Sequence, residues 1–151
     1  MMDWIKSFWR DDIFTNKLSF NKKDFLKRVI IQYKENNENK IINLNDININ
    51  NINKNGTLLK KLILLYPNLK LLLKYINESD ENRKKFNIWV TGSMFNDEEL
   101  KIILQNEIQE KPYSAHTCFN FVDVYKTNEN INKNMLEMQI NIDISKPEFS
   151  D

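Results

Sequence analysis

Ser-Ala-His-Thr-Cys-Phe-Asn, at residues 114–120, is the stretch that decides how this chain of 151 residues folds. From residue 119 to residue 124 the side chains alternate between two faces, which predicts a β-strand. A short apolar run at residues 100–104 predicts a second strand. Cys118 is the only cysteine of the chain and stands where the later strand begins. A thiol beside a loop can be reached by a large partner, whereas an interior cysteine cannot.

Helical patterns surround these strands, so the fold class expected is mixed α/β (α+β), with a small mixed sheet flanked by helices. Residues 57–66 predict a buried helix, and Pro67 begins the next helix, which runs to residue 76. A third helix is predicted over residues 79–91 with acidic side chains in its first turn. Gly92 ends it, because glycine reaches the backbone conformation of a C-cap without strain.

The last predicted helix runs from residue 127 to about residue 142. Its apolar residues repeat at intervals of four, three and four, and we expect them to form its buried face: Ile131, Met135, Met138 and Ile142. We expect the methionines to fill the core rather than to line a binding groove.

The N-terminal third predicts two aromatic-rich amphipathic helices within residues 1–35. The first stripe comprises Trp4, Ile5, Phe8 and Trp9, and the second, which follows Asn21 as N-cap, comprises Phe25, Leu26, Val29, Ile30 and Tyr33. Packing on the core is the expected role, and an exposed interface is the alternative. Residues 36–55 are rich in asparagine and indicate a linker, anchored by Ile47, Ile49 and Ile52. The expected organisation is therefore helices, linker, and a unit over residues 56–151.

Composition excludes several classes of function. The chain carries 22 basic and 21 acidic residues, a net charge of +1, which argues against nucleic acid as a partner. A single cysteine suits a reducing compartment, and no apolar run reaches the roughly 18 residues of a membrane span. We therefore expect a cytoplasmic or nuclear protein with no membrane partner. One cysteine and one histidine cannot complete a zinc site, and two distant glycines make no phosphate loop, so no metal or cofactor is expected.

Ala-His-Thr-Cys-Phe-Asn, at residues 115–120, resembles the active-cysteine motif of the HECT family of ubiquitin-protein ligases. Other segments are similar to the family in the same order. An acidic-start helix ends in Thr-Gly-Ser at residues 91–93, the apolar strand at residues 100–104 follows, and a polar helix leads to a tail that contains Phe149. The resemblance covers about residues 56–151 and implies the fold of the small catalytic C-lobe.

In that family the cysteine accepts ubiquitin as a thioester from a conjugating enzyme and passes it to a substrate amine. The resemblance implies that this chain is a minimal HECT-type ubiquitin transferase with Cys118 as its catalytic residue. Its partners would be ubiquitin, a ubiquitin-conjugating enzyme and a protein substrate whose lysine is modified. One alternative is a non-catalytic interaction module that binds ubiquitin, a conjugating enzyme or a partner ligase. Another is a helical scaffold in which Cys118 is buried.

Four residues are expected to support the active loop: His116, Thr117, Asn120 and Phe149. His116 is the only histidine and could assist Cys118 if the backbone is extended there. Thr117 can bond to the loop or to the thioester carbonyl, and Asn120 is expected to fix the loop. Phe149 resembles the family's terminal phenylalanine, which implies a tail close to the active loop. The group that takes the proton of the attacking amine is left open among Asp123, Glu148, Asp151 and the chain terminus.

The chain also departs from the family pattern. Tyr125 replaces the proline that commonly follows the strand, and the segment after residues 91–93 lacks the usual Pro and Gly-Phe. Residues 1–55 are too few for the family's N-lobe, which recruits the conjugating enzyme. Recruitment by the aromatic stretches near Trp4 and Phe25, recruitment by a partner, and loss of transfer are the alternatives that follow.

Overall fold

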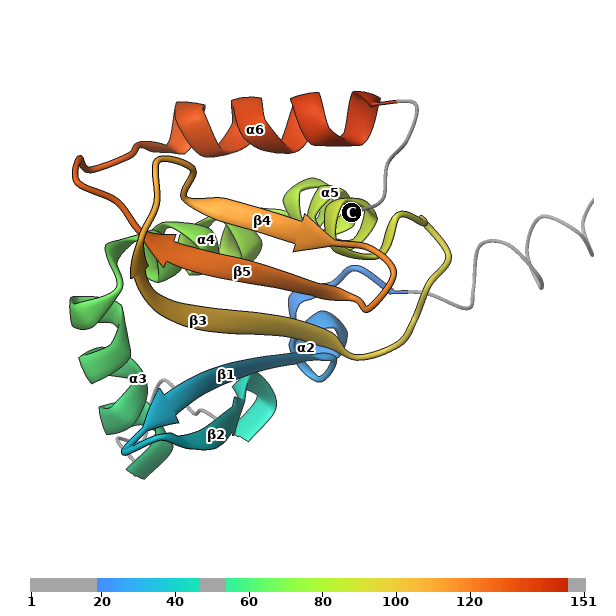
Figure 1. Cartoon of the computed structure of the whole chain (residues 1–151). Helices are drawn as coiled ribbons and strands as arrows, with labels where there is room; N and C mark the ends of the chain where they lie inside the picture. The colour runs from blue at the N-terminus through green and yellow to red at the C-terminus, as the bar shows by residue number, and fades with distance from the viewer. Residues whose placement is uncertain (1–18, 47–53, 147–151) are drawn as a thin grey trace, which may run out of the picture.

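The computed structural model describes residues 19–46 and 54–146, and it confirms the predicted mixed α/β fold (Figure 1). The elements in chain order are α2 (Lys22–Leu26), β1 (Val29–Glu35), β2 (Glu38–Asn43), the 3-10 helix η2 (Leu44–Asp46), α3 (Lys54–Leu65), α4 (Pro67–Glu78), α5 (Asp80–Thr91), β3 (Leu100–Ile108), β4 (Tyr113–His116), β5 (Phe121–Lys126) and α6 (Lys133–Ser145).

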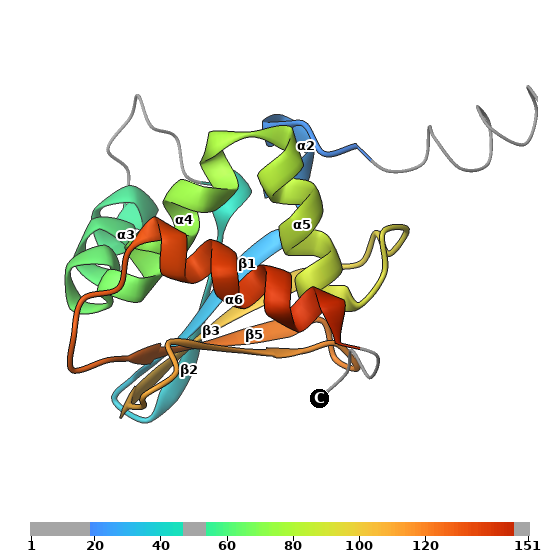
Figure 2. The same cartoon turned by 90° about the horizontal axis from the view of Figure 1, so that it is seen from above.

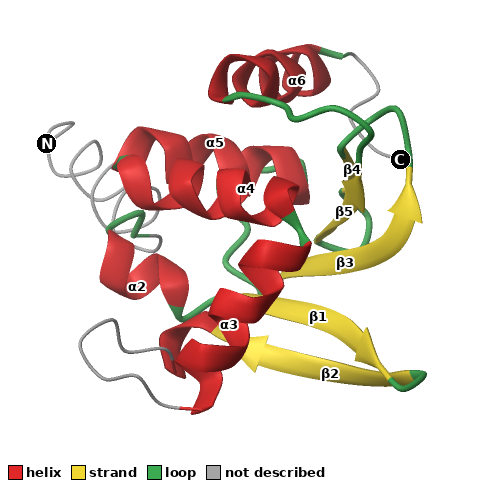
Figure 3. Ribbon diagram, turned by 90° about the vertical axis from the view of Figure 1, so that its left-hand side faces the viewer, coloured by secondary structure: helices red, strands yellow, loops and turns green. Residues whose placement is uncertain are grey.

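The strands form one mixed sheet in the order β2-β1-β3-β5-β4. The three central strands, β1, β3 and β5, are parallel to one another, and β2 and β4 pair antiparallel with them at the two edges. Helices α2, α4 and α5 cover one face of the sheet, and α6 lies beside the β4 edge (Figures 2 and 3). None of the described helices covers the opposite face.

The core lies between the covered face and the helices. Alternate residues of the central strands point into it, and each is at most 7% exposed: Val29, Ile31, Tyr33, Leu100, Ile102, Leu104, Val122 and Val124. A series of buried aromatic rings crosses the core in edge-to-face contacts, from Phe25 through Phe86 and Trp89 to Tyr113. The Tyr113 hydroxyl donates to the carbonyl of Asn68 at 2.6 Å, and burial raises the pKa of Tyr113. These contacts join α2, α4 and α5 to β4.

The helix predicted over the second aromatic stripe is wrong beyond Leu26. Asn21 caps α2 as predicted, because its side chain accepts from the backbone amide of Asp24 at 2.9 Å. The chain then enters β1 at Val29. Three consecutive β-branched residues begin that strand, and such residues favour the extended backbone. The first stripe, near Trp4, lies outside the described residues.

The prediction of a linker is wrong for residues 38–46, which form β2 and η2. Asn36 and Asn37 both have positive φ angles, 53° and 66°, and form the two-residue turn of the β1–β2 hairpin. Asparagine tolerates this left-handed conformation better than other non-glycine residues, which explains the composition. Because β1 also pairs with β3, the hairpin shares a sheet with the unit predicted over residues 56–151. Ile47, Ile49 and Ile52 lie outside the described residues.

The predictions for the central helices mostly hold. Pro67 begins α4, and the Ser79 side chain caps α5 by accepting from the amide of Asn82 at 3.0 Å. Gly92 ends α5 with a φ of 76°. Helix α3 begins about one turn earlier than predicted, and its burial was overestimated, because Leu64 is 82% exposed.

The last helix, α6, begins at Lys133 rather than at residue 127 and ends at Ser145. Of its predicted buried face, Ile131 packs partly buried against the core just before the helix, and the prediction is wrong for the other three residues. The methionines of α6 are 48% and 62% exposed and Ile142 is 52% exposed, whereas Leu136 and Ile140 are fully buried. The buried face also contains Asp143, whose carboxylate accepts a hydrogen bond from the indole nitrogen of Trp89 at 2.9 Å. Two apolar stripes therefore compete along this helix, and the stripe that shares a face with Asp143 packs on the core. The methionines face outward.

We expect Asp143→Ala to destabilise the protein by about 1–3 kcal/mol, because the buried Trp89 indole loses its acceptor. Urea unfolding followed by far-UV circular dichroism measures the effect. Glu137→Ala on the same helix is the control, since Glu137 is partly exposed and pairs with Lys133 on the surface, and it should change stability by less than about 0.5 kcal/mol. Equal effects of the two substitutions would contradict the role of the buried hydrogen bond.

Candidate active site

Cys118 lies in the turn over residues 117–120 that joins β4 to β5, and its side chain is exposed. The amide of Phe119 donates to the carbonyl of His116 at 3.2 Å, which closes the turn. Phe119, the next residue in the turn, is 70% exposed. Strand β5 begins two residues later than predicted, so Cys118 sits in the turn that precedes the strand. The scaffold alternative with a buried Cys118 is therefore wrong.

Asn120 fixes this turn to the loop that joins α5 to β3. It has a positive φ of 57°, and its side-chain amide donates to the Glu98 carboxylate at 2.8 Å. The Asn120 carbonyl accepts from the amide of Lys101 at 3.0 Å. These bonds join two segments that lie side by side at one end of the sheet, at the right in Figure 1.

The α5–β3 loop is itself held by Arg28, which precedes β1. One guanidinium nitrogen donates to the carbonyls of Asn96 at 2.7 Å and Glu98 at 3.0 Å, and to the Asn87 side chain at 2.9 Å. At the start of the loop, the Thr91 hydroxyl accepts from the amide of Ser93 at 3.1 Å. The Thr-Gly-Ser turn thus begins the loop that supports Asn120. Sequence reasoning missed Arg28, because nothing marks it as different from a surface charge.

His116 and Asp123 form a pair on the open face of the sheet. The Nε2 atom of His116 lies 3.0 Å from Oδ2 of Asp123. A carboxylate can only accept a hydrogen bond, so Nε2 carries a proton and donates to Asp123. In the neutral ring, Nδ1 is then the unprotonated nitrogen. The imidazole stacks on the ring of Phe121 with 4.4 Å between centroids. The pair is therefore held in one orientation at the end of β4.

Asp123 has further donors and is only 7% exposed. Gln105 donates to Oδ1 at 2.8 Å, and the Tyr125 hydroxyl lies 3.4 Å from Oδ2. Burial, followed by the nearby Asp123 carboxylate, raises the pKa of Tyr125. Neither Gln105 nor Tyr125 was predicted. The parallel register that places Ile103 opposite Asp123 brings Gln105 to this face, and sequence alone does not give that register.

The remaining predicted site residues divide into two groups. Thr117 lies in the turn with Cys118 and Asn120. Glu148, Phe149 and Asp151 lie outside the described residues, so Asp123 is the candidate carboxylate that the structure places. Within residues 19–46 and 54–146, no three side chains of the metal-binding types gather into a possible site.

We expect Asn120→Ala to destabilise the protein more than Asn120→Gly. Both variants lose the bond to Glu98, but only alanine is strained at a positive φ, which adds roughly 1–2 kcal/mol. Urea unfolding of both variants measures the difference. If alanine costs no more than glycine, the left-handed backbone at this position is not a constraint on the turn.

Comparison of the chain with protein-family models, with curated proteins and with solved structures found no match. No helix in the described part of the chain is both long and apolar enough to cross a bilayer.

Proposed function

We propose that this protein is a minimal HECT-like ubiquitin-protein ligase that carries ubiquitin on Cys118 as a thioester. The observation that carries the proposal is the exposed thiol in the β4–β5 turn, flanked by the residues of the active-cysteine motif. The turn closes one end of the sheet and presents the thiol to a protein-sized donor. The alternative interaction module shares the turn but needs no chemistry at the sulfur.

Loading of Cys118 is a thiol exchange. The Cys118 thiolate attacks the thioester carbonyl on a conjugating enzyme, the new carbon–sulfur bond forms, and the donor cysteine leaves as a thiolate. The acceptor therefore has to be accessible and fixed in place. Asn120 and Arg28 supply the fixing by holding the turn and the adjacent loop.

Discharge to a lysine needs a proton acceptor. The amine attacks the carbonyl, the bond to Cys118 breaks, and the amine proton must leave. Asp123 is buried and already accepts from three side chains, so we assign it the role of orienting His116. His116 is half-buried, and because it is two residues from Cys118 their Cα atoms are at most about 7.6 Å apart. We assign the proton transfer to the Nδ1 atom of its ring, because Nε2 donates to Asp123.

The proposal predicts an adduct on Cys118. Incubation with activating enzyme, a panel of conjugating enzymes, ubiquitin and ATP should give a ubiquitin adduct that reductant removes. Cys118→Ala should abolish the adduct, and Cys118→Ser should give an ester that resists reductant. Binding to a conjugating enzyme without any adduct across the panel would reject the ligase and favour the interaction module.

The roles assigned to the histidine pair predict different effects on the two steps. In single-turnover discharge to free lysine, His116→Gln should slow the reaction about 100-fold, the lower limit for a general base, with loading nearly unchanged. Asp123→Asn should slow discharge by a factor between that of His116→Gln and that of the control. Ser114→Ala, on the same strand with its hydroxyl 3.4 Å from the ring, is the matched control and should be near neutral. Equal discharge rates for wild type and His116→Gln would exclude the role of His116.

A further inference from the structure

The outward face of α6 carries an apolar stripe. Met135, Met138 and Ile142 follow one another at intervals of three and four residues, and each is about half exposed or more. Together with Lys111 and Pro112 from the loop between β3 and β4, they line an open groove of about 460 Å³. A stripe of this kind on a surface helix is typical of an interaction site, because a solvated helix normally carries polar residues there.

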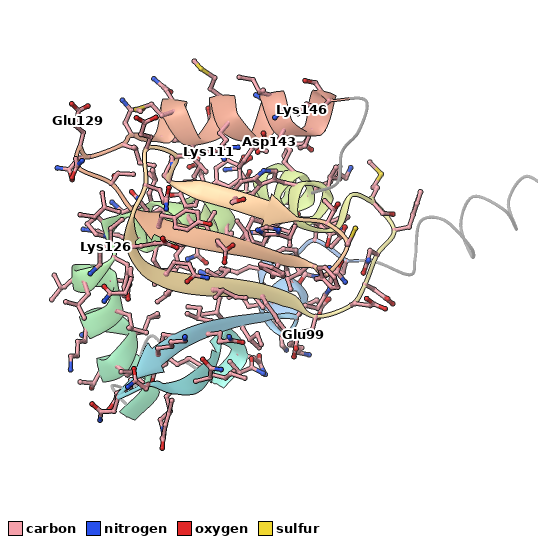
Figure 4. The ribbon with its side chains drawn as sticks, in the orientation of Figure 1. Glu99, Lys111, Lys126, Glu129, Asp143 and Lys146 are labelled. Atoms are coloured by element: carbon pink, nitrogen blue, oxygen red, sulfur yellow. The ribbon has the colours of Figure 1, made fainter. Side chains whose placement is uncertain are left out.

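The two ends of this face differ in charge. Glu110 and Glu129 line a second hollow that Met135 shares, next to the first turn of α6. Lys146 follows the last turn and forms an ion pair with Asp143 at 3.4 Å. Figure 4 shows Glu129 and Lys146 at opposite ends of the helix, with Lys111 between them. The first end is therefore acidic, and the other end presents the ammonium group of Lys146, whose side chain is 54% exposed whereas that of Asp143 is 12% exposed.

We propose that this α6 face binds a second copy of the chain, with the two α6 helices antiparallel across a two-fold axis. In that arrangement Met135 of one copy lies opposite Ile142 of the other, so that the stripes cover each other. Lys146 of each copy lies opposite Glu110 and Glu129 of its partner. The charge distribution is thus self-complementary, as a two-fold interface requires. Lys111 lies at the side of the stripe, on the loop that flanks the helix.

The area available for contact on this face is small. Helix α6 has 13 residues and is about 20 Å long. A contact of this length lies at the low end of specific interfaces, so we expect weak, concentration-dependent association. The groove residues come from α6 and the β3–β4 loop, and none comes from the turn that carries Cys118. The dimer therefore forms independently of the chemistry proposed at that turn.

Sedimentation velocity from about 10 µM to about 1 mM should show a monomer–dimer equilibrium for the full chain. Met138→Lys should weaken dimerisation at least tenfold, because it places a charge in the middle of the stripe. Leu64→Lys, at an 82% exposed leucine of α3, is the matched control and should leave the equilibrium unchanged. A protein that stays monomeric over the whole range would overturn the proposal. The stripe would then be a site for another segment of the chain or for a different protein.

A charge exchange tests the antiparallel arrangement without altering the apolar residues. Lys146→Glu makes both ends of the face acidic, and Glu110→Lys with Glu129→Lys makes both ends basic. Each variant alone should dimerise at least tenfold more weakly than wild type. An equimolar mixture should form the heterodimer, since every contact then joins opposite charges. Two variants that both dimerise like wild type, or a mixture no stronger than its components, would overturn this arrangement.

Discussion

The parallel pairing of β3 with β5 is the constraint on which the candidate site depends. Lys101 lies opposite Phe121 in this pairing, so the two strands begin at the same end of the sheet. The segments that precede them, the α5–β3 loop and the β4–β5 turn, must therefore lie next to each other. Asn120 and Glu98, 22 positions apart in sequence, meet there. A slip of one residue would turn Asp123 to the covered face and Val122 to the open face.

The uneven covering of the sheet determines what the open face can hold. Parallel strands are usually covered on both faces, whereas here the described helices cover one face only (Figure 3). Asp123 is nevertheless almost buried, because side chains of the sheet itself enclose it. The stacked rings of His116 and Phe121 form part of that enclosure. A polar pair can thus be rigid and still lie at the surface, which a site for a protein-sized substrate needs.

The sequence predicted best where one local signal dominated. Helix α5 was predicted because Ser79 and Gly92 mark its ends. Strand β5 was predicted because residues 119, 121 and 123 alternate with residues 120, 122 and 124. The β1–β2 hairpin was missed because Phe25, Val29 and Tyr33 also fit helical spacing, and the Asn36–Asn37 turn looked like low complexity.

The candidate site likewise combines residues that a local sequence pattern could predict with residues that it could not. The motif around Cys118 is local, so its place in a turn at the edge of a strand could be predicted. Arg28 and Gln105 reach the site through strand pairing, between residues that are far apart in the chain. No local pattern gives that pairing, because register is set by the whole sheet. The partners of Asn120 and Asp123 could therefore be found only in the structure.

The orientation of α6 shows how a single polar contact decides between two hydrophobic stripes. The methionine stripe and the Leu136–Ile140 stripe could each cover the core, and apolar area alone does not choose between them. If α6 were rotated so that the methionines faced the core, the buried Trp89 indole would lose its acceptor. The free-energy cost of an unsatisfied buried donor is larger than the net gain from an ordinary neutral hydrogen bond. Asp143 therefore fixes the buried face, since its carboxylate is satisfied there by Trp89 and Lys146. The exposed methionines are a consequence of that bond, and their pairing with a second copy would remove them from water without rotating the helix.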